Sequence, residues 1–273
     1  MKAMDDEIAS LHKNNTWELV EKISNRKTVG CKWIFRVKEG LTAAEPRRFK
    51  ARLVAKGYTQ KEGVDFKEVF SPVVRHASIR VLLALTAVND MELDQLDVKT
   101  AFLHGRLEEE ILMTQPEGYI DPKKPDYVCL LKKSLYGLKQ SPRQWYLRFD
   151  EFMISHGYLR CNYDCCVYYK LVKTDLYIYL LLYVDDMLVA CKSRTEIEAL
   201  KQLLNSEFDM KDLGQAKKIL GMEIRRNRER GTMFLTQRKY LERVLASFGM
   251  TDCKSVKTPL AAYFKLSSLQ CPK

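Results

Sequence analysis

The most constraining feature of this chain is a pair of adjacent acids between two strongly apolar segments. Asp185 and Asp186 separate Tyr177–Val184, which reads YIYLLLYV, from Met187–Cys191, which reads MLVAC. Both segments have the aliphatic and aromatic content of buried strands. The sequence therefore predicts a β-hairpin with buried flanks and with the two acids at its turn.

Aspartates are common in turns, so a purely structural turn is one interpretation of the pair. The pair lacks the glycine that tolerates positive φ, and two carboxylates about 4 Å apart repel by about 4 kcal/mol at an effective dielectric near 20. A bound divalent cation would reverse that repulsion, and hard oxygen ligands suit Mg²⁺. Asp97 ends the strand-like segment Met91–Val98 and is the natural third ligand, because two-metal phosphoryl transfer needs carboxylates from separate strands.

Helices and strands are mixed irregularly along the rest of the chain. The predicted helices are residues 5–12, 78–88 with Ser78 as the N-cap, 141–156, 195–208 and 237–248. Two alternating segments, Cys31–Lys38 and Phe49–Val54, predict a second hairpin with basic residues on one face. This order favours an α+β fold over a regular βαβ series.

The charge balance favours an anionic partner. The 273 residues contain 46 Lys and Arg against 35 Asp and Glu, a net charge of +11. The excess is concentrated in the segments Lys22–Lys61 and Lys211–Lys257. These segments are either two solvated faces or two walls of a groove that holds a polyanion. Nucleic acid is the commonest polyanionic partner of a protein.

Several classes of protein are disfavoured. The start of the chain, MKAMDDEIASL, has no long apolar stretch, so no secretory signal is visible. The apolar stretch Leu176–Cys191 carries two acids at its middle and makes a poor membrane span. The eight cysteines form no C-x-x-C pair, which favours reduced thiols inside a cell. The cluster Cys161, Cys165 and Cys166 lacks a fourth ligand and the spacing of a metal site.

Nine stretches of the chain together identify a family. They are NNTWELV, CKWIFRVK, RFKARLVAKGYTQ, FSPVVR, QLDVKTAFLHG, MTQPEGY, KSLYGLKQSPRQWY, YVDDMLVA and LGMEI. In this order they resemble the reverse transcriptase domain of copia-type LTR retrotransposon Pol polyproteins. The resemblance implies an RNA-directed DNA polymerase with a right-hand fold of fingers, palm and partial thumb around an antiparallel palm sheet.

The resemblance also implies domain boundaries. The reverse transcriptase domain would span residues 1–260, with a tail at 261–273 that looks truncated. Within the domain, the implied fingers are about 14–90 and 106–150, the palm about 91–105 and 151–224, and the thumb-like part 225–260.

The resemblance assigns roles at the predicted metal site. Asp97, Asp185 and Asp186 match the catalytic palm carboxylates that bind two Mg²⁺ ions, for which Mn²⁺ is a possible substitute. The Val98 carbonyl is a further implied ligand. Phe102 matches the residue beneath the sugar of the incoming nucleotide, where a ring would clash with a 2′-hydroxyl; plain core packing is the alternative for Phe102.

Other residues match nucleotide and primer contacts. Lys50 and Arg52 would bind the triphosphate, although a solvated strand face would carry the same residues. Tyr136 and Gly137 match the loop against the nucleotide, where glycine permits close backbone approach. Tyr183 would pack beside the primer end. The implied primer grip is Leu220, Gly221 and Met222, and either Lys217 or Lys218 would protonate pyrophosphate.

The implied partners are an RNA template, a DNA primer and dNTPs, with no membrane. The resemblance also implies a cytoplasmic particle, and a parent polyprotein whose ribonuclease H and integrase regions are absent from this chain; the oligomeric state stays open. Two other functions remain open. One is a fragment of a decayed element that binds nucleic acid without useful polymerase activity, and the other is a DNA-templated polymerase of the same palm class.

Overall fold

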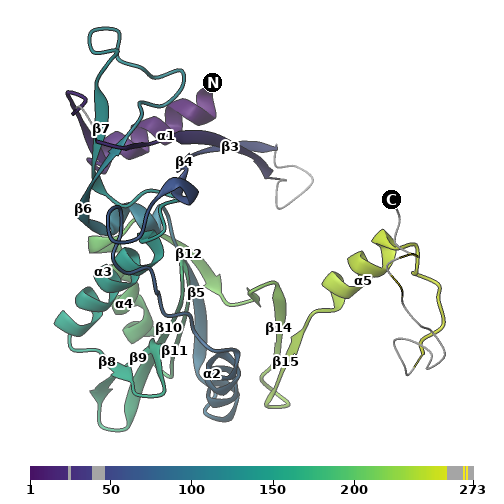
Figure 1. The fold of residues 1–273 in the computed structure, drawn as a ribbon. Coiled ribbons are helices and arrows are strands. Elements are labelled where there is room, and N and C mark those ends of the chain that lie inside the picture. Colours follow the sequence, from purple (N-terminus) through teal and green to yellow (C-terminus); the bar gives the residue numbers. More distant parts are fainter. Residues whose placement is uncertain (24–25, 39–46, 257–266, 268, 270–273) are drawn as a thin grey trace.

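A six-stranded antiparallel sheet forms the centre of the molecule (Figure 1). The computed structural model describes residues 1–23, 26–38, 47–256, 267 and 269. The strands follow the order β12-β5-β11-β10-β9-β8, and every neighbouring pair is antiparallel. Their bounds are β5 (Glu92–Val98), β8 (Leu159–Cys161), β9 (Asp164–Lys173), β10 (Leu176–Tyr183), β11 (Asp186–Cys191) and β12 (Met210–Gln215). The predicted α+β class with an antiparallel sheet is confirmed.

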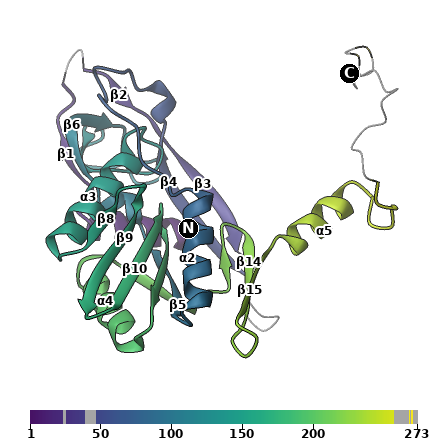
Figure 2. The same cartoon turned by 90° about the horizontal axis from the view of Figure 1, so that it is seen from below.

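Helices cover both faces of this sheet. Residues Met187–Cys191 of β11 are all fully buried, and neighbouring residues of a strand point to opposite faces. Figure 2 shows α2 on one side of the sheet and α3 and α4 on the other. These helices are α2 (His76–Val88), α3 (Ser141–Ser155) and α4 (Arg194–Glu207), close to their predicted positions.

The turn of the apolar hairpin differs from the prediction by one residue. Tyr183 lies opposite Asp186 in the β10–β11 register, so the turn consists of Val184 and Asp185. Val184 has φ of 56°, a strained conformation for a β-branched residue. The Trp145 indole of α3 donates a hydrogen bond to the Val184 carbonyl at 2.5 Å. This contact stabilises the strained turn. Asp186 is then the first residue of β11.

A second hydrophobic core lies beneath a smaller sheet and a hairpin. Its buried residues include Leu11, Leu53, Met113 and Leu131. The sheet has the order β1-β7-β6-β2, and the predicted basic hairpin is β3–β4. The bounds are α1 (Lys2–Lys13), β1 (Trp17–Val20), β2 (Thr28–Val29), β3 (Cys31–Lys38), β4 (Arg48–Ala55), η1 (Gly57–Thr59), η2 (Ala101–His104), β6 (Arg106–Met113) and β7 (Val128–Lys133).

The start of α2 corrects the predicted cap. The N-cap is Arg75 and not Ser78. The Asp164 carboxylate on β9 accepts hydrogen bonds from the Arg75 amide at 2.9 Å and from the Ser78 hydroxyl at 2.5 Å. Asp164 also accepts a bond from the Cys166 amide, so both of its oxygens are engaged. Its closeness to the thiols of Cys165 and Cys166 is therefore explained by helix capping, without a metal ion.

A hairpin and an exposed helix follow the central sheet in the described part of the chain. The hairpin consists of β13 (Lys218–Ile219), β14 (Met222–Asn227) and β15 (Thr232–Thr236), and α5 (Arg238–Ser247) follows it. Figure 1 shows α5 projecting away from the sheets, and none of its residues is buried. Most of the predicted tail, 261–273, lies outside the described residues. Across the described ranges, no helix has the length and apolar character needed to cross a membrane.

Candidate active site

Sheet register brings the three predicted acids together. Asp186 of β11 lies directly opposite Asp97 of β5, and Cα atoms of such antiparallel partners are about 4.5–5.5 Å apart. Asp185 occupies the adjoining turn, where its carbonyl accepts a hydrogen bond from the Val98 amide at 3.0 Å. The predicted convergence of the lone aspartate with the doublet is present in the fold.

The electrostatics of this cluster fit a divalent cation. Burial raises the pKa of the Asp186 carboxyl, and the negative charges of Asp185 and Asp97 raise it further. Gln95 opposes this effect, since its amide donates a hydrogen bond to Asp186 Oδ1 at 3.4 Å. Crowded carboxylate oxygens are the donor set that Mg²⁺ prefers, and a cation would relieve their repulsion.

Gln95 is a site residue that the sequence analysis missed. It precedes Asp97 by two positions on β5, and residues two apart in a strand share a face. That spacing was a usable signal, because it places the Gln95 amide on the face that carries the Asp97 carboxylate.

A basic pocket of about 300 Å³ collects most of the predicted nucleotide-binding residues. Its lining consists of Ile34, Arg36, Lys50, Arg52, Val54, Tyr136 and Gly137. Arg36 of β3 lies directly opposite Lys50 of β4, and Arg52 is two residues farther along the same face. Arg36 was not among the predicted site residues, although the alternation of β3 places it on the basic face. Three cations therefore line one small concave surface.

Two aromatic rings connect this pocket to the acids. The Arg52 guanidinium lies 4.8 Å from the centre of the Tyr136 ring. The centres of the Phe102 and Tyr136 rings are 5.2 Å apart. Burial raises the pKa of Tyr136 to about 12, and the charges of Asp185 and Asp97 add to this increase. Tyr136 therefore lines the basic pocket, packs against Phe102 and is close enough to Asp185 and Asp97 for their charges to act on it.

The close approach of Gly137 is to the protein backbone. Its φ is +93°, and an added Cβ would overlap the Ala55 carbonyl oxygen and lie 2.6 Å from Val54 Cγ1. The preceding carbonyl, of Tyr136, accepts a hydrogen bond from the Ala55 amide at 2.7 Å. The glycine thus lets the loop pack directly on β4, while its predicted contact with a nucleotide stays a prediction.

Gly137→Ala is expected to destabilise the chain by about 3 kcal/mol, because it combines an unfavourable φ with the overlap at β4. Gly118→Ala is the matched control, since Gly118 has φ of +82° with nothing within 4 Å of an added Cβ. The control should cost only about 1 kcal/mol. Thermal unfolding measures both changes, and equal losses would refute the packing role.

The predicted primer contacts lie in two places. Tyr183 is directly opposite Asp186 and so belongs to the acid cluster. Leu220 and Gly221 form the turn of the β13–β14 hairpin, with φ of 50° and 79°, which suits a two-residue hairpin turn. Gly221 and Lys218 line a separate groove of about 550 Å³ beside α5, so the fold does not place them in the basic pocket. The last predicted primer contact, Met222, begins β14. Lys217 and Lys218, the two predicted candidates for the general acid, are both exposed.

Comparison with known proteins decides the family. Residues 14–262 match the model of a family described as reverse transcriptase (RNA-dependent DNA polymerase). The chain belongs to this family. The antiparallel sheet that bears the acids agrees with the α+β polymerase fold expected of a reverse transcriptase.

Curated relatives of this reverse transcriptase chain are retrotransposon polyproteins. It is 54% identical over 272 residues to a retrovirus-related Pol polyprotein from transposon TNT 1-94 of Nicotiana tabacum, covering 100% of this chain and 20% of the relative. It is 39% identical to that from transposon RE1 of Arabidopsis thaliana, covering 97% of this chain and 18% of the relative. The chain thus spans about a fifth of each relative's length, and the predicted likeness to copia-type Pol proteins is confirmed.

Among solved structures, a foamy viral protease-reverse transcriptase in complex with double-stranded DNA matches with a TM-score of 0.42 and 13% identity. The match covers 91% of this chain and 40% of the viral one. A likeness this weak supports no inference about the site.

Proposed function

We propose that this chain is an RNA-directed DNA polymerase that transfers a nucleotide from a dNTP to a primer 3′-hydroxyl on an RNA or DNA template. One observation carries the proposal. Asp97 and Asp186 face each other across β5 and β11, and Asp185 adjoins them. Nucleotidyl transfer needs such carboxylates beside cations that bind the triphosphate.

Asp97, Asp185 and Asp186 would hold two Mg²⁺ ions, or Mn²⁺ in their place, with the Val98 carbonyl as a further ligand. When bound, the ions would activate the primer hydroxyl and stabilise charge on the leaving pyrophosphate. The chain's own part is to keep these carboxylates at adjacent strand ends. Gln95 orients the Asp186 carboxylate through its amide.

The basic pocket would bind the triphosphate. Lys50 and Arg52 offer charge-assisted hydrogen bonds to phosphate oxygens, and Arg36 adds a guanidinium with a planar fork of donors. Tyr136 and Gly137 would border the nucleotide on the other side. Either Lys217 or Lys218 would protonate the pyrophosphate; both are exposed, Lys217 directly before β13 and Lys218 as its first residue.

Phe102→Ala is expected to raise ribonucleotide incorporation relative to deoxynucleotide incorporation by about 10–100-fold, because the smaller side chain leaves room for a 2′-hydroxyl. The Phe102 ring is half-buried against Tyr136, so its position is fixed by packing. Steady-state extension with rATP and dATP measures the ratio. Leu103→Ala is the control, since Leu103 is fully buried beside it; unchanged discrimination in Phe102→Ala would assign Phe102 to core packing alone.

Primer extension tests the proposed function. The chain should extend oligo(dT) on poly(rA) in Mg²⁺, and extension should stop when EDTA removes the metal. Binding of the template–primer without any incorporation would instead support the fragment of a decayed element. A strong preference for a poly(dA) template would support a DNA-templated polymerase.

A further inference from the structure

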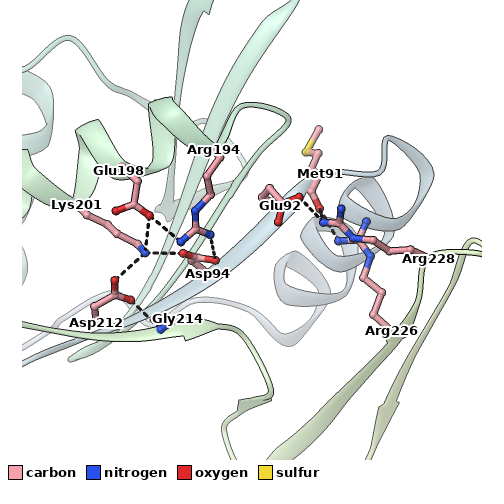
Figure 3. Close-up of polar contacts among 10 residues, drawn as sticks. All are labelled: Met91, Glu92, Asp94, Arg194, Glu198, Lys201, Asp212, Gly214, Arg226 and Arg228. Atoms are coloured by element: carbon pink, nitrogen blue, oxygen red, sulfur yellow. Dashed lines mark hydrogen bonds and ion pairs between the residues drawn. The ribbon is translucent and has the colours of Figure 1, made fainter.

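Two arginines fasten the β13–β15 hairpin to the strand that carries Asp97 (Figure 3). The Arg226 guanidinium on β14 donates hydrogen bonds to the carbonyl of Met91, to the carbonyl of Thr86 at 3.2 Å and to Asp90 Oδ1 at 2.6 Å. Its side chain is only 9% exposed. Arg226 is thus a buried cation whose donors are directed at one short segment of the chain.

That segment is the link between α2 and β5. Helix α2 ends at Val88, and Asp90 turns the chain with φ of 46°. The carbonyls at a helix end lack intrahelical partners and attract cations, which accounts for the place of Arg226. Arg228 strengthens the same junction through Glu92 Oε1 at 2.6 Å. Lysine could not replace this set of contacts, because only guanidinium offers five donors in a rigid fork.

The hairpin is fixed at both of its ends, to β5 itself and to the residue directly before β5. Before β13, the Ala216 amide donates a hydrogen bond to the Leu93 carbonyl at 2.9 Å. After the turn, the Arg226 side chain donates a hydrogen bond to the Met91 carbonyl. Arg226 lies five positions after the turn glycine, Gly221, which corresponds to about 16 Å of strand. At that length, a rotation of about 5° at the anchor would move the turn by about 1.4 Å.

We propose that Arg226 is a positioning residue that fixes the Leu220–Gly221 turn relative to Asp97, and with it the 3′ end of a primer. This inference rests on the proposed polymerase function and on the predicted primer grip at Leu220, Gly221 and Met222. Arg226 itself touches no substrate, and its effect passes through the hairpin. Helix α5 follows β15 directly, so the same anchor also sets the base of the thumb-like helix. An error of about 1 Å at reacting groups costs about 100-fold in rate.

Hydrogen exchange tests the anchor without any need for catalysis. In the 273-residue chain, Arg226→Lys should speed amide exchange at Met222–Asn227 by tenfold or more and leave β10 and β11 unchanged. Arg225→Lys is the matched control, because Arg225 lies on the same strand with a 61% exposed side chain. Equal exchange in the two variants would overturn the proposal. If Arg226→Lys does not fold, Asp90→Asn removes the charge from one of the three groups that Arg226 contacts, which weakens that contact and should act in the same direction.

Single-turnover primer extension tests the consequence for the primer. Arg226→Lys should lower the extension rate constant 10–100-fold, with the KM for dNTP and the active fraction unchanged. A variant that is merely less stable would lose active fraction at an unchanged rate constant, and that result would also overturn the proposal. If the wild-type chain extends no primer, the proposed function fails, while the exchange experiment still decides whether Arg226 fixes the hairpin.

Discussion

Asp186→Asn is expected to abolish primer extension, with a loss of at least about 10³-fold, while it stabilises the metal-free chain. The activity is lost because asparagine is a neutral, weaker ligand for a divalent cation. The stability increases because burial and the charges of Asp185 and Asp97 disfavour the ionised carboxylate in the folded state. Primer extension and thermal unfolding in EDTA measure the two effects on one variant.

The sign of the pH dependence follows from the raised pKa of Asp186. The folded chain binds this proton more tightly than the unfolded chain does. The stability that the protonated carboxyl contributes is therefore fully present at pH values below the unfolded pKa, and it is lost as pH rises through the raised folded pKa. Asp186→Asn should remove this pH-dependent loss, which a series of thermal unfolding curves between pH 4 and 7 would show.

Metal binding gives an independent readout of the same site. Mg²⁺ at about 100 times its Kd would stabilise the wild-type chain by about 2.7 kcal/mol, or roughly 5–10 °C in Tm. Asp186→Asn should lose most of this increase. The control is Asp126→Asn, at an exposed aspartate, which should leave both activity and the Mg²⁺ effect unchanged. An Asp186→Asn chain that extends primers normally would contradict the metal-site assignment.

Lys201→Met is expected to destabilise the chain by about 3–5 kcal/mol, because it leaves the buried Asp94 carboxylate short of a partner. Lys201 Nζ lies 2.5 Å from Asp94 Oδ2, and the two side chains are 4% and 1% exposed (Figure 3). Burial alone would lower the pKa of Lys201, but hydrogen bonds to Asp212, Asp94 and Glu198 outweigh it and raise the pKa. Lys201 is therefore charged, and urea unfolding measures its loss.

A double variant separates the effect of an unpaired buried charge from the effect of lost packing. Asp94→Leu combined with Lys201→Met removes both charges and should recover most of the lost stability, since an apolar pair can replace a buried ion pair. Lys192→Met, at an exposed lysine just before α4, should change stability by less than about 0.5 kcal/mol. A double variant as unstable as Lys201→Met alone would refute the charge explanation.

Local pattern was sufficient to predict most elements. The alternation of Cys31–Lys38 gave the basic face of β3, and the apolar run at Tyr177–Val184 gave β10. Strand periodicity and buried composition are properties of a few consecutive residues, so they can be read without the fold. The cap of α2 could not be predicted, because Asp164 comes from a distant strand and displaced the local candidate Ser78.

The candidate site shows the same division. The sequence alone was enough to name the acids. Their residue types and the family resemblance pointed to Asp97, Asp185 and Asp186 without the fold. Their meeting depends on the register that pairs Asp186 with Asp97, and the turn at Val184 depends on the Trp145 contact from α3.

The sequence by itself determined the chemistry of the side chains and the local elements that carry them. The tertiary structure alone decided which of these residues touch. It joined Arg36 to the basic pocket, aimed Gln95 at Asp186 and fastened Arg226 to the end of α2. The reason is physical: a hydrogen bond between remote segments depends on the packing and register of whole sheets, and no short window of sequence contains that information.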